Sequence, residues 1–124
     1  MDQDRSSAAG NTRQKGNAGE DAAAEYLLSL GYTIISRNYQ TRRGEIDCIA
    51  EDPSGTLVFC EVKSAESPRL GHPAYWVTRD KQRKIIRMAQ RYLAEHRYTS
   101  KACRFDVVTI YTGKIEHYKN AFFA

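Results

Sequence analysis

Two short apolar segments joined by a turn place the strongest constraint on how this chain can fold. Residues 45–51 and 56–63 are rich in apolar and β-branched side chains, and residues 52–55, with the sequence DPSG, are typical of a turn. The pattern predicts two antiparallel strands joined as a hairpin. With a three-residue loop at residues 53–55, Cys48 lies opposite Cys60 and Asp47 lies opposite Glu61.

The rest of the chain predicts two helices and three more strands. Apolar residues at helical spacing, ending with Leu30, predict a helix over about residues 17–30. Thr78 is a suitable N-cap for a second helix over about residues 79–97. The core-facing side chains expected on this helix are Ile85, Ile86, Ala89 and Leu93. Further strands are expected at residues 32–39, 105–111 and 114–118, with a long loop at residues 64–77. The order αβββαββ predicts an α/β fold with a mixed β-sheet flanked by helices.

Length and composition limit the class of protein. The 124 residues suit a single domain, which we expect at residues 16–124 after a solvated tail at residues 1–15. The hydrophobic share of 41% excludes full disorder, and no apolar run approaches the roughly 20 residues of a membrane span. Because residues 1–15 also lack the apolar stretch of a secretory signal, we expect a cytoplasmic protein without a membrane partner. The three cysteines match no zinc-site spacing and are expected to be reduced and buried: Cys48, Cys60 and Cys103.

The second strand of the hairpin carries a carboxylate and an amine on one face. Glu61 and Lys63 are two residues apart, so both project from the same side, and the predicted register brings Asp47 beside them. Neighbouring carboxylates repel each other unless a cation lies between them. Oxygen ligands favour Mg²⁺ or Mn²⁺ over zinc, and Glu20 of the first helix could add a third carboxylate. Such a site predicts hydrolysis of phosphodiester bonds. The alternatives are an exposed cross-strand ion pair for Glu61 and Lys63, and a helix-dipole role for Glu20.

Basic residues are concentrated in one part of the sequence. Residues 69–104 contain ten Lys and Arg residues and two acidic residues, although the net charge of the whole chain is only +4. Such a block predicts a polyanionic partner, with a merely solvated helix face as the alternative. The candidate phosphate-binding residues are Arg42, Arg43, Lys81, Arg83, Lys84, Arg87 and Arg91. Tyr75 and Trp76 in the long loop are suited either to stack on an unpaired base or to anchor the loop to the core.

The spacing of these residues resembles a known nuclease signature. Residues 44–47 (GEID) and 59–63 (FCEVK) are similar to the PD-(D/E)xK motif, and their surroundings resemble the YraN-like family of small bacterial proteins, predicted endonucleases related to archaeal Holliday-junction resolvases. Supporting matches are residues 16–20, 37–38, 71, 73, 81, 104–107 and 120–122. Two departures are Ile46 in place of the motif's proline, and Ser64-Ala65 where Thr and a basic residue are expected.

The resemblance implies a restriction-endonuclease-like fold and a role for each matching residue. Asp47, Glu61 and the backbone carbonyl of Val62 would ligate Mg²⁺ (or Mn²⁺), Lys63 would be the catalytic lysine, and Glu20 would be the helix acid of the resolvase-like branch. The leading hypothesis is a metal-dependent endonuclease acting on DNA, including branched recombination or repair intermediates, with a homodimer as the expected assembly. The alternatives are a non-catalytic nucleic-acid-binding module of the same fold, and a structural protein whose basic face docks an acidic partner.

Overall fold

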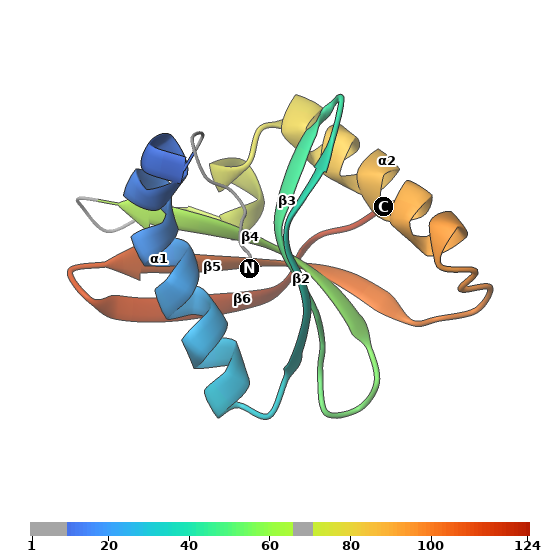
Figure 1. The fold of residues 1–124 in the computed structure, drawn as a ribbon, viewed down its shortest axis with the longest axis horizontal. Helices are drawn as coiled ribbons and strands as arrows, with labels where there is room; N and C mark the ends of the chain where they lie inside the picture. The colour runs from blue at the N-terminus through green and yellow to red at the C-terminus, as the bar shows by residue number, and fades with distance from the viewer. Residues whose placement is uncertain (1–9, 66–70) are drawn as a thin grey trace.

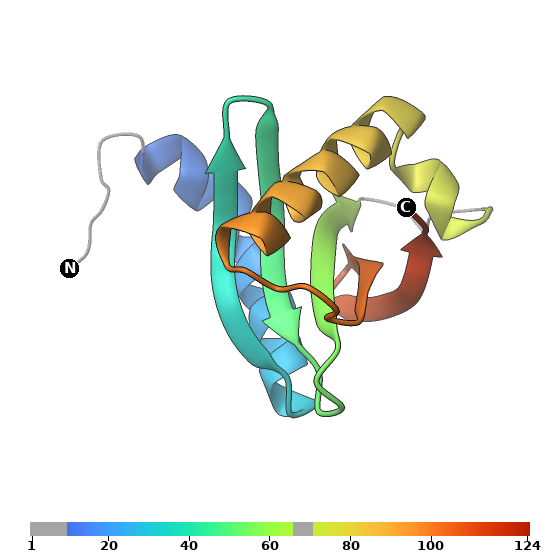
Figure 2. The ribbon, with the colours of Figure 1, turned by 90° about the vertical axis from the view of Figure 1, so that its right-hand side faces the viewer.

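The computed structural model describes residues 10–65 and 71–124, in which a five-stranded sheet has one helix on each face (Figures 1 and 2). The elements follow in the order α1 (Gly10–Ser29), β2 (Thr33–Thr41), β3 (Gly44–Glu51), β4 (Leu57–Ala65), η1 (Pro73–Trp76), α2 (Arg79–Glu95), β5 (Cys103–Tyr111) and β6 (Lys114–Phe122). The predicted order αβββαββ and the mixed sheet flanked by helices are confirmed.

The strands lie side by side in the order of the sequence, from β2 to β6. All neighbours are antiparallel except β4 and β5, which are parallel. A parallel pair needs a long crossover, and α2 provides it on one face of the sheet, while α1 covers the other face (Figure 2). The sheet therefore has a separate apolar core on each side.

The two cores use opposite sides of the central strands. On the α2 side, Phe59 of β4 and Val107 of β5 pack with Ile85 and Tyr92. The core on the α1 side contains Leu27, Cys48, Cys60 and Val108, among other residues. Strands that are buried on both faces explain the near-continuous apolar character of β4 and β5.

The hairpin between β3 and β4 has the predicted turn and register. The amide of Asp52 donates to the carbonyl of Thr56 at 2.9 Å, and one carboxylate oxygen of Asp52 accepts from the amides of Ser54 and Thr56, each at 2.9 Å. Cys48 pairs with Cys60 as expected. A local turn rule therefore fixes which residues of the two strands face each other.

Helix α2 begins as predicted but buries a slightly different face. The hydroxyl of Thr78 accepts from the amide of Lys81 at 3.1 Å, which confirms the N-cap. The helix ends at Glu95, and Arg97 then adopts a φ of 59°. Of the expected core-facing side chains, Ile85 and Ala89 are buried, whereas Ile86 and Leu93 only border the core. Met88 and Tyr92 are buried in addition, because the inner face is rotated towards them.

Three further expectations from the sequence are wrong. Helix α1 starts at Gly10, before the predicted start at residue 17, because polar helical turns give no hydrophobic periodicity to detect; the rest of the predicted tail, residues 1–9, lies outside the described residues. Leu30 is 45% exposed, since the helix ends at Ser29 and Tyr32 fills the core instead. Cys103 is exposed at the start of β5, while Cys48 and Cys60 are buried.

Neither helix of the described residues combines the length and the apolar character that crossing a bilayer requires.

Candidate functional site

Asp47 and Glu61 lie at the inner end of the β3–β4 pairing, directly beyond the Cys48–Cys60 pair. The Asp47 side chain reaches across to β4, where its Oδ2 accepts a hydrogen bond of 2.8 Å from the backbone amide of Val62. Both acids are almost completely shielded from solvent, with exposed fractions of 9% for Asp47 and 3% for Glu61. Both carboxylates are thus buried just beyond the regular β3–β4 pairing, which ends at Cys48 and Cys60 and does not include the expected pair of Asp47 with Glu61.

The pKa of Asp47 reflects this environment. Burial, together with the negative charges of Glu61 and Glu20, raises the pKa of its carboxyl group from 3.8 to about 8, against the opposing effects of the Val62 amide and Lys81. Without a compensating cation, the Asp47 carboxyl is therefore largely protonated at neutral pH. The site is electrostatically short of positive charge.

Two lysines contact Glu61 on the α2 side of the sheet. Lys81, in the first turn of α2, places its Nζ 2.5 Å from Glu61 Oε2, and Lys63 Nζ lies 3.8 Å from the same oxygen. Burial alone lowers the pKa of Lys81, but the hydrogen bond and the charge of Glu61 more than reverse this and raise it. Lys81 therefore reaches the site with its amino group, although its side chain is 45% exposed.

The second oxygen of Glu61 has no partner among the described residues. Glu61 Oε1 is buried and accepts no hydrogen bond there. A buried carboxylate oxygen without a partner carries a large desolvation cost, so such atoms are rare unless an ion or water serves them. This oxygen fits a hard divalent cation, which prefers oxygen ligands and tolerates an incomplete protein shell completed by water.

A third and a fourth acid approach Asp47 from the α1 side. Glu20 of α1, Glu45 of β3 and Asp47 each offer a carboxylate oxygen, and these three oxygens lie within 4.8 Å of one another. The side-chain amide of Asn38 in β2 donates to Glu20 Oε1 at 3.0 Å and to Glu45 Oε2 at 3.1 Å. Asn38 therefore holds these two acids in place beside Asp47. The sequence reasoning assigned no role to Glu45, although its position two residues before Asp47 was a usable signal.

Strand β2 changes faces at Asn38. Arg37 forms an ion pair with Asp21 of α1, whereas Tyr39, only two residues later, packs against Tyr92 of α2 with ring centroids 5.3 Å apart. In a regular strand these two side chains would lie on the same face. The φ of Asn38 is 56°, in the left-handed region, which accounts for the break.

Strand β3 changes faces at the same rung. Arg37 pairs with Cys48 and Tyr39 with Ile46, so Asp47 occupies the rung opposite Asn38. Cys48 belongs to the core on the α1 side and Ile46 to the core on the α2 side. Asp47 is thus the residue at which β3 crosses from one face of the sheet to the other. This position lets it lie near Glu20 on the α1 side and near Glu61, with its partner Lys81, on the α2 side.

The predicted phosphate-binding residues divide into those close to the acids and those along α2. Arg43, Lys81 and Lys84 line a hollow of about 230 Å³ between the β2–β3 turn and the start of α2, which Glu45 also borders. Arg42 lines a neighbouring hollow of about 360 Å³ with Arg43. The remaining candidates are exposed on α2: Arg83, Arg87 and Arg91.

Two of these cations have acidic neighbours on the same helix. Lys84 lies 3.3 Å from Asp80, and Arg91 Nε lies 2.9 Å from Glu95. Exposed pairs at this spacing are weak, so both cations can exchange their partners for phosphate oxygens.

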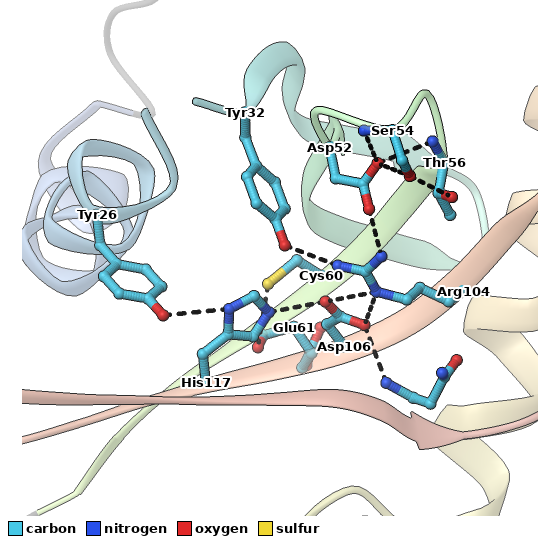
Figure 3. Close-up of polar contacts among 11 residues, drawn as sticks. Tyr26, Tyr32, Asp52, Ser54, Thr56, Cys60, Glu61, Arg104, Asp106 and His117 are labelled. Carbon is cyan, nitrogen blue, oxygen red and sulfur yellow. Dashed lines mark hydrogen bonds and ion pairs between the residues drawn. The ribbon is translucent and has the colours of Figure 1, made fainter. Parts of the chain in front are cut away.

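A second polar cluster lies on the α1 side and has a structural role (Figure 3). Asp106, which is completely buried in β5, accepts from Arg104 Nε at 3.0 Å and pairs with His117 Nε2 at 2.7 Å. Arg104 also donates to Asp52 and to the hydroxyl of Tyr32, each at 2.7 Å. Asp106 therefore forms a buried ion pair with Arg104. The cluster ties the β3–β4 turn and the segment after α1 to β5 and β6.

The family model and the related sequences that match this chain belong to one family. The model of the uncharacterised protein family UPF0102 matches residues 19–110. A UPF0102 protein of Persephonella marina is 48% identical over 108 residues, covering 87% of this chain and 92% of that protein. A UPF0102 protein of Symbiobacterium thermophilum is 50% identical over 102 residues, covering 82% of this chain and 86% of its own length. Among solved structures, Pyrococcus furiosus SfsA in complex with Ca²⁺ aligns with 87% of this chain and 63% of its own, at 16% identity and a TM-score of 0.34, a likeness too low to inform fold or function.

Proposed function

Because the chain belongs to the UPF0102 family, the YraN-like group that its sequence resembles, and because it buries the carboxylates of Asp47 and Glu61 near two lysines, we propose that it is a metal-dependent endonuclease. Its reaction is the hydrolysis of DNA phosphodiester bonds, and its substrates are branched recombination or repair intermediates. The oxygen Oε1 of Glu61 carries this proposal, because a buried carboxylate oxygen without a partner among the described residues is suited to bind a cation.

The acids act as ligands and positioning groups. Asp47 and Glu61 would hold Mg²⁺ or Mn²⁺, together with the carbonyl of Val62, whose amide already fixes the Asp47 side chain. Glu20 would complete the set from the α1 side. When bound, the ion supplies polarisation of a phosphoryl oxygen and a lower pKa for attacking water. Binding of a cation would also favour the charged form of Asp47 and so remove the electrostatic cost of burying it.

The lysines have separate tasks. Lys63, with a side chain that is 25% exposed, is accessible enough to reach a substrate phosphate, where it would orient the attacking water or stabilise developing negative charge. Lys81 holds Glu61 Oε2, which leaves Oε1 as the oxygen without a partner among the described residues. Lys81 therefore acts as a positioning residue for the Glu61 carboxylate.

The hollow beside the site fits a phosphate backbone. Arg43 and Lys84 line it next to the acids, and Arg83 and Arg87 extend the basic surface along the exposed side of α2. Such contacts fix the position of DNA without reading its sequence. We therefore expect selection by the shape of the DNA rather than by base sequence.

A cleavage assay with Mg²⁺ on duplex, single-stranded and four-way-junction DNA tests the proposal. Asp47→Ala, Glu61→Ala and Lys63→Ala should each lower the cleavage rate by about a hundredfold or more, because each removes a ligand or a charge-stabilising group. Binding of DNA, measured separately, should change little. Glu25→Ala is the matched control, since Glu25 is an exposed acid on α1 and contacts none of these groups.

A non-catalytic nucleic-acid-binding module is the second candidate, and one observation favours it. The Lys81–Glu61 ion pair already neutralises one carboxylate without a metal ion. A wild-type protein that binds DNA but leaves every substrate uncut with Mg²⁺ and with Mn²⁺ would support this module and refute the nuclease.

A further inference from the structure

We propose that a hollow at the start of α2, outside the acidic site, binds an unstacked nucleobase of a DNA strand. The hollow has a volume of about 500 Å³ and lies where η1, the first turn of α2 and the end of β6 meet. Figure 2 shows the end of β6 beside η1 and the beginning of α2. The inference rests on the proposed function, because it assigns to that nuclease a preference for DNA with unpaired bases.

Two exposed aromatic side chains border this hollow. Tyr75 of η1 is 84% exposed and Phe123, just after β6, is 74% exposed. These are the largest exposed fractions among the large hydrophobic side chains of the part of the chain that the structure describes. Both occur at the same place, so the surface offers two aromatic rings around one apolar hollow.

The floor of the hollow is part of the core. Val77, Ala121 and Phe122 line it and are each at least nine-tenths buried. Trp76, next to Tyr75, packs against Tyr118 with ring centroids 4.9 Å apart. The two aromatic residues of the loop therefore have different environments: Trp76 anchors the loop, whereas Tyr75 is directed to solvent at the rim. A rigid floor with exposed rings is suited to stacking, which depends on a flat surface more than on hydrogen bonds.

The charges around the hollow favour a nucleotide over an apolar partner. Arg79 begins α2 and lines the hollow, so a cation lies within the same surface as the two rings. Two residues further along this helical turn, Lys81 reaches Glu61 of the acidic site. One DNA strand could thus place a base against Tyr75 and Phe123 while its backbone runs over Arg79 towards the acids. A base that is paired and stacked in a duplex is not available for this contact, so the hollow selects single-stranded or branched DNA.

Binding measurements on the full chain test this inference separately from cleavage. The probes are a duplex, and the same duplex with a single-stranded extension that carries 2-aminopurine, a fluorescent base that dims on stacking. Both are titrated in EDTA, so that no cutting occurs. The wild type should quench the fluorescence and bind the extended DNA more tightly than the plain duplex.

Tyr75→Ala and Phe123→Ala should each weaken binding of the extended DNA by about fivefold or more and reduce the quenching, because a stacked base loses its partner. Their affinity for the plain duplex should match that of the wild type. Tyr98→Ala is the control, since Tyr98 is a partly exposed aromatic residue beyond the far end of α2. It should leave both affinities unchanged.

The outcomes separate the two proposals. Cleavage that requires Asp47, together with unchanged binding and quenching in Tyr75→Ala and Phe123→Ala, would overturn the base-binding hollow and leave the nuclease intact. Quenching that is lost in both variants, in a protein that never cuts DNA, would support the hollow and refute the nuclease. Variants that bind DNA normally but shift the chain from a dimer to a monomer would assign the hollow to a second copy and overturn the inference.

Discussion

Asp47→Asn should change how the stability of the metal-free protein depends on pH. The native pKa of Asp47 is raised from 3.8 to about 8, mainly by burial and by the charge of Glu61. Between these two values the unfolded chain has released the proton that the folded chain still holds. Stability contributed by this group is therefore fully present below the unfolded pKa and is lost as pH rises towards the folded pKa.

The size of the effect follows from linkage. One proton bound only in the folded state lowers the free energy of unfolding by about 1.4 kcal/mol for each pH unit. From about pH 5.5 to about pH 7.5 the free energy of unfolding of the wild type should fall by up to about 2.7 kcal/mol more than that of Asp47→Asn, because the asparagine side chain does not titrate. This value is an upper limit, because water entering the site reduces the penalty of the charged form.

Asparagine is the matched substitution because its side-chain oxygen can still accept from the amide of Val62. Urea unfolding in EDTA at both pH values measures the free energies, and the same titrations with Mg²⁺ complete the test. Mg²⁺ should restore the free energy of unfolding that the wild type loses at the higher pH, and it should leave the free energy of unfolding of Asp47→Asn almost unchanged. Parallel pH profiles for the two proteins in EDTA would refute the argument that burial of Asp47 is uncompensated.

Three further substitutions test the surroundings of the site. Asn38→Gly keeps the left-handed φ but removes the amide that bridges Glu20 and Glu45, so it should lower the cleavage rate more than the free energy of unfolding. Asn38→Ala should in addition lower the free energy of unfolding by about 1 kcal/mol, because alanine is strained at this φ, and equal urea profiles for the two variants would contradict this. Gly19→Ala would place a Cβ 2.5 Å from Ser64 Oγ, so the substitution should destabilise the otherwise wild-type protein in thermal unfolding. In a Ser64→Ala background the same substitution should raise the free energy of unfolding by up to about 1 kcal/mol, because alanine favours the helix over glycine. A change of the same sign in both backgrounds would argue against the close approach. Asp106→Asn should cost about 3 kcal/mol or more in urea unfolding, because Arg104 loses a buried partner, and a cost under about 1 kcal/mol would count against this cluster as a structural anchor.

Local rules were sufficient for much of the fold. The turn at residues 52–55 fixed the register of β3 and β4, because a short loop leaves one pairing of the strands. Thr78 marked the start of α2 because its hydroxyl caps a free amide of the first turn. Both predictions depend on residues that are close together in the sequence, and both are confirmed.

Contacts between distant residues could not be derived in the same way. The sequence predicts a mixed sheet, but the apolar runs of β4 and β5, which are buried on both faces, do not show that these two strands are its parallel neighbours. The contact of Lys81 with Glu61 depends on the angle at which α2 crosses the sheet. The sequence alone therefore does not show whether the Lys81 amino group faces the site or the solvent.

The way in which the acids come together could not be predicted for a different reason. The alternation rule assumes that a strand keeps its faces, and under that rule Asp47 belongs to a single side of the sheet. Instead, β2 and β3 both change faces at one position, where Asn38, with its left-handed φ, lies opposite Asp47. A regular strand would have presented Asp47 either to Glu20 on α1 or to the lysine-bound Glu61 on the other side. The break lets one carboxylate lie between these two groups, so the irregularity that defeats the period-two prediction is the feature that assembles the site.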